Sequence, residues 1–302
     1  MAFLHENKSD FLYCINMASQ NFSVLPHIVE KDYYVTMILR GLAEHLDFIV
    51  FKGGTSLSKC HKVIKRFSED IDITIDNRLS QGQMKNLKKC IKGIAVDLGM
   101  TIPNIEDTRS RRSYNRYVMQ YDSVLSASDE IVQNAVLMET SFAEVSFPTV
   151  PLLVRSYIGD IVKDEAPDEL KNLHLDPFGM KVQGIDRTLV DKVYAICDYY
   201  LQNRVRKHSR HIYDIYKLLP LVPMDESFRK LVQEVREVRK MTNICPSAQD
   251  GVNVPALLDT IISEEVYRQD YEVVTSRILE ENVDYDAAIK SVAEIASSGM
   301  FR

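Results

Sequence analysis

Phe51-Lys52-Gly53-Gly54-Thr55-Ser56-Leu57-Ser58-Lys59 is followed, a short way along the chain, by Arg66-Phe67-Ser68-Glu69-Asp70-Ile71-Asp72-Ile73, and these two stretches decide the fold. The apolar residues 48–51 predict a strand that runs into a double-glycine turn. On a strand, residues two apart point to the same side. Asp70 and Asp72 therefore present two carboxylates on one face, while the isoleucines between and after them fill the core.

Two carboxylates on one face supply the oxygen ligands with which Mg²⁺ or Mn²⁺ holds a nucleoside triphosphate. Gly53 and Gly54 allow the backbone to approach the phosphates because neither residue has a Cβ. The hydroxyls of Thr55 and Ser56 follow the glycines directly and are further phosphate ligands in this interpretation. The pattern predicts a nucleotidyl-transfer site with Mg²⁺ (or Mn²⁺) as cofactor and a nucleoside triphosphate (NTP) as substrate.

Composition indicates a soluble protein with a sizeable core. The chain has 302 residues, of which 45% are hydrophobic and 26% are charged. It contains no apolar run of 18 residues, so we expect no membrane span, and its start lacks a secretory-signal pattern. The five cysteines lie far apart without a Cys-x-x-Cys pair, which argues against a zinc site and favours the reducing cytoplasm.

The order of elements predicts an α+β fold. A helix over 25–46 precedes the first strand, and a second helix over 83–98 is expected to stop at Gly99. Strand-like runs follow, whereas the sequence beyond Asp186 has almost wholly helical periodicity. We therefore expect a nucleotidyltransferase-type mixed sheet flanked by helices in residues 1–165, and a mainly helical domain in 166–302 that completes the active site. The charged, proline-containing stretch 164–168 is the expected connector.

Gly-Gly followed by Asp-x-Asp, in that order between apolar strands, resembles the DNA polymerase β superfamily of nucleotidyltransferases. The fuller strings 51–59 and 66–72 are closer to one branch, the AbiEii/AbiGii toxins, which include the MenT toxins. The resemblance implies transfer of a nucleoside monophosphate (NMP) from an NTP to an acceptor, with release of pyrophosphate. In the family, tRNA 3′ ends are acceptors for some members, and an antitoxin protein is the usual partner.

A second group of candidate residues lies in the helical half. Lys192 is expected on the buried side of a helix, where an ammonium needs an anion unless it snorkels to water. Asp214 lies four residues after Arg210 and could simply pair with it. The resemblance favours active-site roles for both, because the family carries a lysine and an aspartate in two such helices. The matching residues here are Arg187, Thr188, Asp191, Lys192, Arg210, His211 and Asp214.

Roles follow from this interpretation. Asp70 and Asp72 are expected to bind two ions, one organising the triphosphate and the other lowering the pKa of the attacking hydroxyl. Lys192 is expected to neutralise charge on the departing pyrophosphate, and Asp214 either orients Lys192 or adds a metal contact. Glu139, which interrupts an apolar run, is the candidate third metal ligand, although it could equally face solvent at a strand edge.

Several other residues are candidates for phosphate or RNA binding. Ser68, Lys59 and Arg66 are expected near the triphosphate, although each could be an ordinary loop or surface group. The net charge of −6 gives no overall attraction to nucleic acid, yet local basic runs can hold an RNA backbone by charge or form a solvated face. The residues of these runs are Arg109, Arg111, Arg112, Arg204, Arg206 and Lys207.

Two alternatives to RNA modification stay open. NMP or phosphate could be transferred to a protein side chain, or the chain could be a nucleotide-binding module without turnover. The presence of Asp70, Asp72 and Lys192 argues against the second alternative. A kinase P-loop is excluded because Ser58 stands where the Walker spacing after Gly53 requires glycine.

Overall fold

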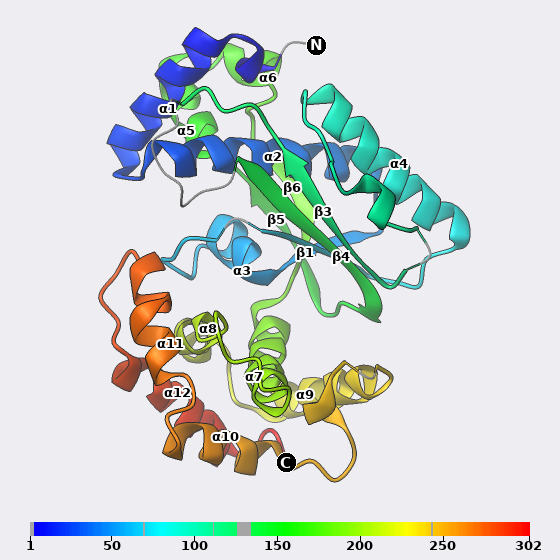
Figure 1. Ribbon diagram of the computed structural model, residues 1–302, viewed down its shortest axis with the longest axis vertical. Helices are drawn as coiled ribbons and strands as arrows, with labels where there is room; N and C mark the ends of the chain where they lie inside the picture. Colours follow the sequence, from blue (N-terminus) through cyan, green and yellow to red (C-terminus); the bar gives the residue numbers. More distant parts are fainter. Residues whose placement is uncertain (1–2, 69, 111, 126–133, 243) are drawn as a thin grey trace. The chain divides into compact units, whose positions relative to one another are not determined.

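The computed structural model describes residues 3–68, 70–110, 112–125, 134–242 and 244–302, drawn in Figure 1. The chain forms two compact units. The first unit contains residues 1–55, 69–142 and 149–182, and the second contains 56–68, 143–148 and 183–302. Among the described residues, we find no helix with the length and apolar character needed to cross a bilayer.

The first unit is built on a six-stranded sheet in the order β3-β4-β2-β1-β6-β5. β1 pairs antiparallel with β2 and parallel with β6, and β3 pairs antiparallel with β4, so the sheet is mixed as predicted. The strands are β1 (Ile49–Lys52), β2 (Ile71–Ile75), β3 (Tyr114–Gln120), β4 (Ala135–Val145), β5 (Thr149–Val154) and β6 (Phe178–Gln183).

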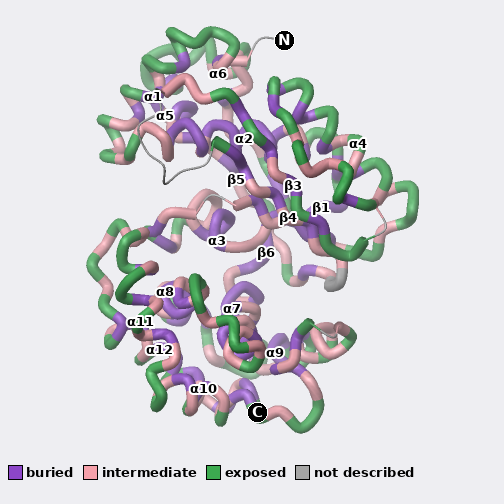
Figure 2. Tube along the Cα trace, in the orientation of Figure 1, coloured by how far each residue is buried: buried purple, intermediate pink, exposed green. Residues whose placement is uncertain are grey.

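Helices flank this sheet (Figure 1). α2 is buried along most of its length and packs against α1, α4 and α5, which makes it the central helix of the unit (Figure 2). Pro26 stands in the first turn of α2, where its missing N–H costs nothing. The helical segments are η1 (Leu4–Glu6), α1 (Lys8–Phe22), α2 (Pro26–His45), α4 (Gln81–Asp97), η3 (Ile105–Asp107), α5 (Tyr157–Glu165) and α6 (Glu169–Asn172).

Strand β2 confirms the predicted alternation. Ile71, Ile73 and Ile75 are all buried, whereas Asp72 is only half-buried on the opposite face. Asp70 stands directly before the strand and is also half-buried. The apolar side of β2 thus faces the core, and the half-buried aspartates lie on the opposite side.

Helix α4 (Gln81–Asp97) confirms the helix expected over 83–98 and its stop at Gly99, but it begins two residues earlier, at a Ser80 cap. The Ser80 hydroxyl accepts from the Gln83 backbone N–H at 3.2 Å, and the Gln83 side chain accepts from the Ser80 N–H at 2.9 Å, which forms a capping box. Gly99 follows the helix with φ +62°, a conformation that favours glycine. Between these ends, Leu87 and Ile91 are buried.

The second unit is mainly helical, as predicted. α7 packs against α8, α9 and α10, and α12 packs against α8 and α10, around one apolar core. The segments are η2 (Leu57–His61), α7 (Ile185–Leu201), α8 (Arg210–Leu218), η4 (Leu219–Leu221), α9 (Glu226–Lys240), η5 (Pro246–Ala248), α10 (Val254–Ser263), α11 (Arg268–Val273), η6 (Thr275–Ile278) and α12 (Tyr285–Ser298).

The boundary between the units differs from the expected one at 165. Stretch 164–168 only joins α5 to α6, and the first unit continues to residue 182 because β6 adds to the sheet beside β1, with Val182 opposite Phe51. Segment 56–68 belongs to the second unit, since Leu57 and Ile64 are part of its core. The composition of stretch 164–168 indicated a connector between the units, whereas the pairing of β6 with β1 extends the first unit to residue 182.

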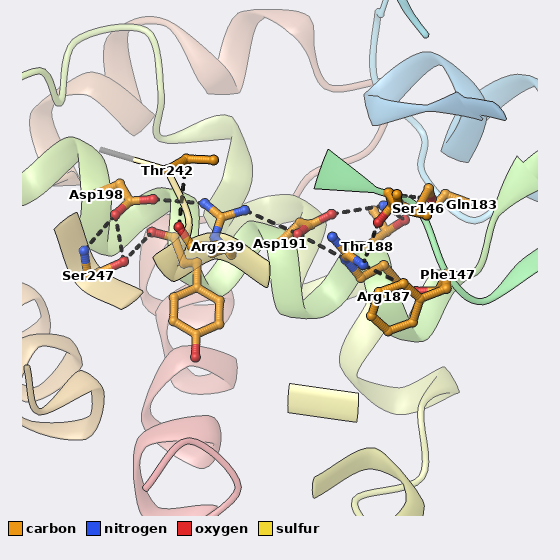
Figure 3. Close-up of polar contacts among 12 residues, drawn as sticks. Ser146, Phe147, Gln183, Arg187, Thr188, Asp191, Asp198, Arg239, Thr242 and Ser247 are labelled. Atoms are coloured by element: carbon orange, nitrogen blue, oxygen red, sulfur yellow. Dashed lines mark hydrogen bonds and ion pairs between the residues drawn. The ribbon is translucent and has the colours of Figure 1, made fainter. Parts of the chain in front are cut away.

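A polar network on α7 organises the second unit (Figure 3). Asp191 Oδ1 lies 3.2 Å from both Arg187 Nε and Arg239 Nη1, and Arg239 Nη2 donates to Asp198 Oδ2 at 2.8 Å. Asp198 Oδ1 accepts from both the backbone N–H and the hydroxyl of Ser247, at 2.8 and 2.6 Å. The network ties α7 to α9 and to η5.

The same network reaches segment 143–148 (Figure 3). Gln183 Nε2 donates to Asp191 Oδ2 at 3.0 Å and to Thr188 Oγ1 at 3.1 Å, while its Oε1 accepts from the Ser146 hydroxyl at 2.8 Å. Arg187 Nη1 donates to the Phe147 carbonyl at 3.3 Å. Arg187, Thr188 and Asp191, which matched the family pattern, therefore fix the start of α7 and the segment packed against it.

Candidate active site

In the first unit, Gly53 stands against the carboxylate of Asp72. Lys52, at the end of β1, lies opposite Asp72 of β2 in the antiparallel register. Gly53 has φ +80°, and a Cβ at this position would overlap the Asp72 carboxylate. Glycine is required here for two reasons, the backbone conformation and the close approach of the acid. The predicted turn and the predicted acidic pair are thus parts of one local structure.

Glu139 lies on β4, the strand beside β2. Tyr114 of β3 links the two strands electrostatically, since burial, its hydrogen bond to Glu139 and the Asp72 charge all raise its pKa. Glu139 Oε1 is 3.8 Å from Arg116 Nε, which gives this carboxylate an ion-pair partner. Its role as third metal ligand stays a prediction.

The acidic pair suits Mg²⁺ or Mn²⁺ without a third carboxylate. Within the described parts of the chain, no group of three or more His, Cys, Asp or Glu side chains has the geometry to hold a metal. Mg²⁺ is commonly bound by one or two carboxylates together with substrate phosphates. Asp70 and Asp72, both half-buried at the start of β2, match that donor set.

The predicted phosphate ligands follow one another along the chain across the boundary between the units. α3 (Gly53–Ser56) opens on the glycine turn, and Thr55 and Ser56 are both buried within it. Lys59 on η2 and Ser68 are half-buried and belong to the second unit. Their contribution to phosphate binding stays a prediction.

The second unit contains a buried ion cluster centred on Asp214 of α8. Arg66 donates to both carboxylate oxygens, with Nε at 2.7 Å from Oδ1 and Nη2 at 2.9 Å from Oδ2. Lys192 Nζ of α7 lies 3.0 Å from Oδ2 of the same carboxylate and 3.1 Å from His211 Nδ1. All four side chains are buried, and Asp214 is 0% exposed.

Charge and burial set the protonation of this cluster. Burial alone would raise the pKa of Asp214, but the Arg66 and Lys192 charges outweigh it and hold that pKa well below its ordinary value. Burial lowers the pKa of the Lys192 ammonium, and the Asp214 carboxylate opposes this shift without cancelling it. Burial and the Lys192 charge lower the pKa of His211 well below its usual range. His211 is therefore neutral and accepts a hydrogen bond from Lys192.

This geometry decides between several alternatives. Lys192 does not snorkel to water, and Asp214 is bound by Arg66 and Lys192 rather than by Arg210. Both Asp214 oxygens contact cations, and its role in orienting Lys192 or in binding a metal stays a prediction. Arg66, expected at the triphosphate, is buried and bidentate to Asp214, and its contact with a triphosphate stays a prediction. His211 has no role in the sequence-based prediction, although it belongs to the Arg-His-x-x-Asp pattern that identified Asp214.

The predicted basic runs lie on separate units. Arg109 and Arg112 are exposed between η3 and β3 of the first unit, while Arg111 lies outside the described residues. The second run is exposed between α7 and α8 of the second unit and consists of Arg204, Arg206 and Lys207. Any role of either run in RNA binding stays a prediction.

Replacing Arg66 with methionine should destabilise the second unit. Arg66→Met leaves a buried carboxylate with Lys192 as its remaining cation, and breaking such a pair costs roughly 3–5 kcal/mol of unfolding free energy. Chemical denaturation followed by circular dichroism measures the loss. Arg210→Met is the matched control, since Arg210 is only half-buried on the same helix and Asp214 is bound by other cations; we expect a change within about 0.5 kcal/mol. Equal losses in both variants would contradict the central place of Arg66.

His211 should make stability fall on acidification. Its folded-state pKa is lowered, so the unfolded chain, with a histidine pKa near 6.5, binds the proton first as the pH drops. Between pH 7.5 and 5.5 this one group should remove about 1.4 kcal/mol of unfolding free energy. Paired denaturation curves of wild type and His211→Asn measure it, because the Asn side-chain oxygen can replace Nδ1 as acceptor. A difference between the two proteins that does not change with pH would refute this prediction, and His27→Asn controls for loss of a histidine elsewhere.

Comparison with known proteins agrees with these motifs. A family model described as "Nucleotidyl transferase AbiEii toxin, Type IV TA system" matches residues 38–294. Among solved structures, the fold is similar to MenT4, a nucleotidyltransferase toxin from Mycobacterium tuberculosis H37Rv, with a TM-score of 0.58 and 16% sequence identity over 94% of this chain and 88% of that chain. No curated protein sequence matches. The extent of the family match, over most of the chain, shows that the protein belongs to the AbiEii family of nucleotidyltransferase toxins.

Proposed function

We propose that this protein transfers an NMP group from an NTP to the 3′-terminal hydroxyl of a tRNA. The acceptor oxygen forms a bond to the α-phosphorus, the bond from that phosphorus to the bridging oxygen breaks, and pyrophosphate leaves while the hydroxyl loses its proton. The observation that carries the proposal is the pair Asp70 and Asp72 beside the glycine turn. At position 53 of this turn only glycine fits, because a Cβ would overlap the Asp72 carboxylate.

The first unit would supply the ligands of the triphosphate. Asp70 and Asp72 would hold Mg²⁺ or Mn²⁺, which polarises the phosphates and lowers the pKa of the attacking hydroxyl. Gly53 leaves room for the Asp72 carboxylate against the backbone, and Gly54 and Thr55 lie in the short helix that follows and would contact the phosphates. Ser56, Lys59 and Ser68, in segment 56–68 of the second unit, are further predicted phosphate ligands.

Lys192 would stabilise negative charge on the departing pyrophosphate. Its cluster contains two cations, Arg66 and Lys192, against the single carboxylate of Asp214, and the neighbouring His211 is neutral. The excess positive charge suits a phosphate group.

Membership of the family supports a biological setting for this activity. A toxin of this class would act in the cytoplasm on NTP and tRNA and be restrained by a cognate antitoxin protein. Modification of the tRNA 3′ end would stop aminoacylation and thus translation. The family is described as part of a type IV toxin–antitoxin system, and this supports a protein antitoxin as partner.

Transfer activity should depend on the aspartate pair and on a divalent ion. Purified protein is incubated with each α-³²P-labelled NTP, Mg²⁺ and total tRNA, and we expect labelled RNA that disappears with EDTA. Asp72→Asn should reduce labelling by about 10²–10³-fold, because several kcal/mol of transition-state stabilisation are lost. Lys192→Met should reduce kcat by a similar factor, and Lys217→Met, which removes a lysine paired with Glu281 in the same unit, should leave it unchanged.

Other outcomes of this experiment separate the alternatives. Label on protein in place of RNA would favour modification of a side chain. Tight NTP binding without transfer to RNA or protein would favour a nucleotide-binding module and overturn the enzyme proposal. Sequencing of the labelled RNA 3′ ends then identifies the base added and the tRNA that receives it.

Two glycines offer a matched test of the turn. Gly53 and Gly99 both have positive φ, but a Cβ would overlap Asp72 only at Gly53, whereas at Gly99 it would meet nothing within 4 Å. Gly53→Ala should lower kcat by about 100-fold, since displacement of a reacting group by an ångström costs that much. Gly99→Ala should cost about 1–2 kcal/mol of stability from backbone strain and leave kcat unchanged. Equal activities in both variants would contradict the close approach of Asp72.

A further inference from the structure

Helix α4 carries a concentrated positive charge on a protein whose net charge is −6. Its residues Gln81–Asp97 include four lysines and one aspartate. Lys85, Lys89 and Lys92 are exposed and, at spacings of three and four residues, share one face of the helix. The opposite face is buried in the first unit, and Figure 2 shows exposed positions along the length of α4.

The lysine face is one wall of a groove. A hollow of about 570 Å³ is lined by Lys85, Lys88, Lys89, Lys92 and Ser110 among others. An adjoining hollow of about 500 Å³ shares Lys85 and Ser110 and adds Gln81, Arg109 and Arg112. The two hollows together form the α4 groove, which runs between the helix and the loop before β3. Arg109 and Arg112 thus belong to the same surface as the α4 lysines.

The groove is held in shape by hydrogen bonds. Lys88 Nζ donates to the carbonyls of Ile105 and Thr108, at 3.2 and 2.7 Å, which fastens the loop to α4. The Asn115 side chain accepts from the Arg109 N–H at 2.8 Å and donates to the Arg109 carbonyl at 3.0 Å. One lysine is therefore used to build the groove, and the exposed lysines beside it are positioned for a ligand.

The three exposed lysines keep their charge available to a ligand. In the described residues, no carboxylate forms an ion pair with Lys85, Lys89 or Lys92. Asp97, at the end of α4, is the acidic residue that lines the groove. From Lys85 to Lys92 the helix rises about 10 Å, at 1.5 Å per residue. Roughly three phosphates of one strand fall within that length.

We propose that the α4 groove binds the phosphate backbone of the acceptor RNA. Protein interfaces are depleted in lysine and anchored by aromatic side chains, whereas basic side chains dominate the lining of this groove and Val96 is its exposed large apolar residue. A membrane surface is disfavoured because the apolar face of α4 is already buried in the protein core. The inference rests on the proposed function for the identity of the RNA, whereas its test measures binding alone.

The test is fluorescence anisotropy of labelled tRNA at several KCl concentrations, without NTP. Lys85→Gln/Lys89→Gln/Lys92→Gln should raise Kd about tenfold at 0.1 M KCl and reduce the slope of log K against log salt by about two, or roughly 0.7 for each phosphate that a lysine no longer neutralises. Lys8→Gln/Lys163→Gln/Lys171→Gln is the matched control, with the same change in charge at exposed sites of the same unit, and should retain the wild-type Kd and slope.

The possible results are distinct. An unchanged Kd and slope in the α4 variant would overturn the inference, and so would poly-glutamate that displaces tRNA from wild type as well as unlabelled tRNA does, since the groove would then accept acidic proteins. In the transfer assay, the α4 variant should show a raised KM for RNA with an unchanged kcat. If wild type binds tRNA through α4 yet transfers no NMP, the proposed function fails while the groove assignment stands.

Discussion

The buried carboxylate of Asp214 imposes the constraint on which the second unit depends. A carboxylate with no exposure costs several kcal/mol unless cations and hydrogen bonds surround it, and Arg66 and Lys192 provide these. Arg66 can reach Asp214 only if segment 56–68 lies against the helices. The backbone secures this arrangement, with Phe67 N–H donating to the Ile278 carbonyl at 2.9 Å and Glu280 N–H to the Lys65 carbonyl at 3.0 Å. The stretch between the glycine turn and the aspartates is therefore fixed by the need to neutralise one acid.

Helix α7 contributes side chains to two polar networks on different faces. Neighbouring residues of its motif therefore make different contacts. Arg187 and Asp191 belong to the network with α9, Gln183 and segment 143–148 (Figure 3). Lys192, next in the chain, points instead into the ion cluster with α8. Residues one apart on a helix are about 100° apart around its axis, so one short motif can brace a helix and aim a functional side chain. The rigid network on one face limits the movement available to Lys192 on the other.

Local patterns predicted the parts of this protein that are decided locally. The strand, the glycine turn and the alternation around Asp72 follow from spacing within a few residues, as does the Gly99 stop of α4. The partnership of Arg66 with Asp214 joins residues 148 positions apart, and no periodicity predicts such a pairing. The extent of the first unit was not predicted from sequence for the same reason, because β6 joins this unit by pairing with the distant strand β1.

In the first unit, the aspartates at β2 and the lysines of α4 lie on consecutive elements of the chain. Asp70 directly precedes β2 and Asp72 lies in it, and the chain then passes from the end of this strand into α4 with its lysines. The proposed metal site is acidic and the proposed RNA groove is basic, and each attracts a ligand of opposite charge. The lysines of α4 give the first unit a strong local attraction for a polyanion. The net charge of −6 conceals this division, which is visible only when charge is assigned to individual elements.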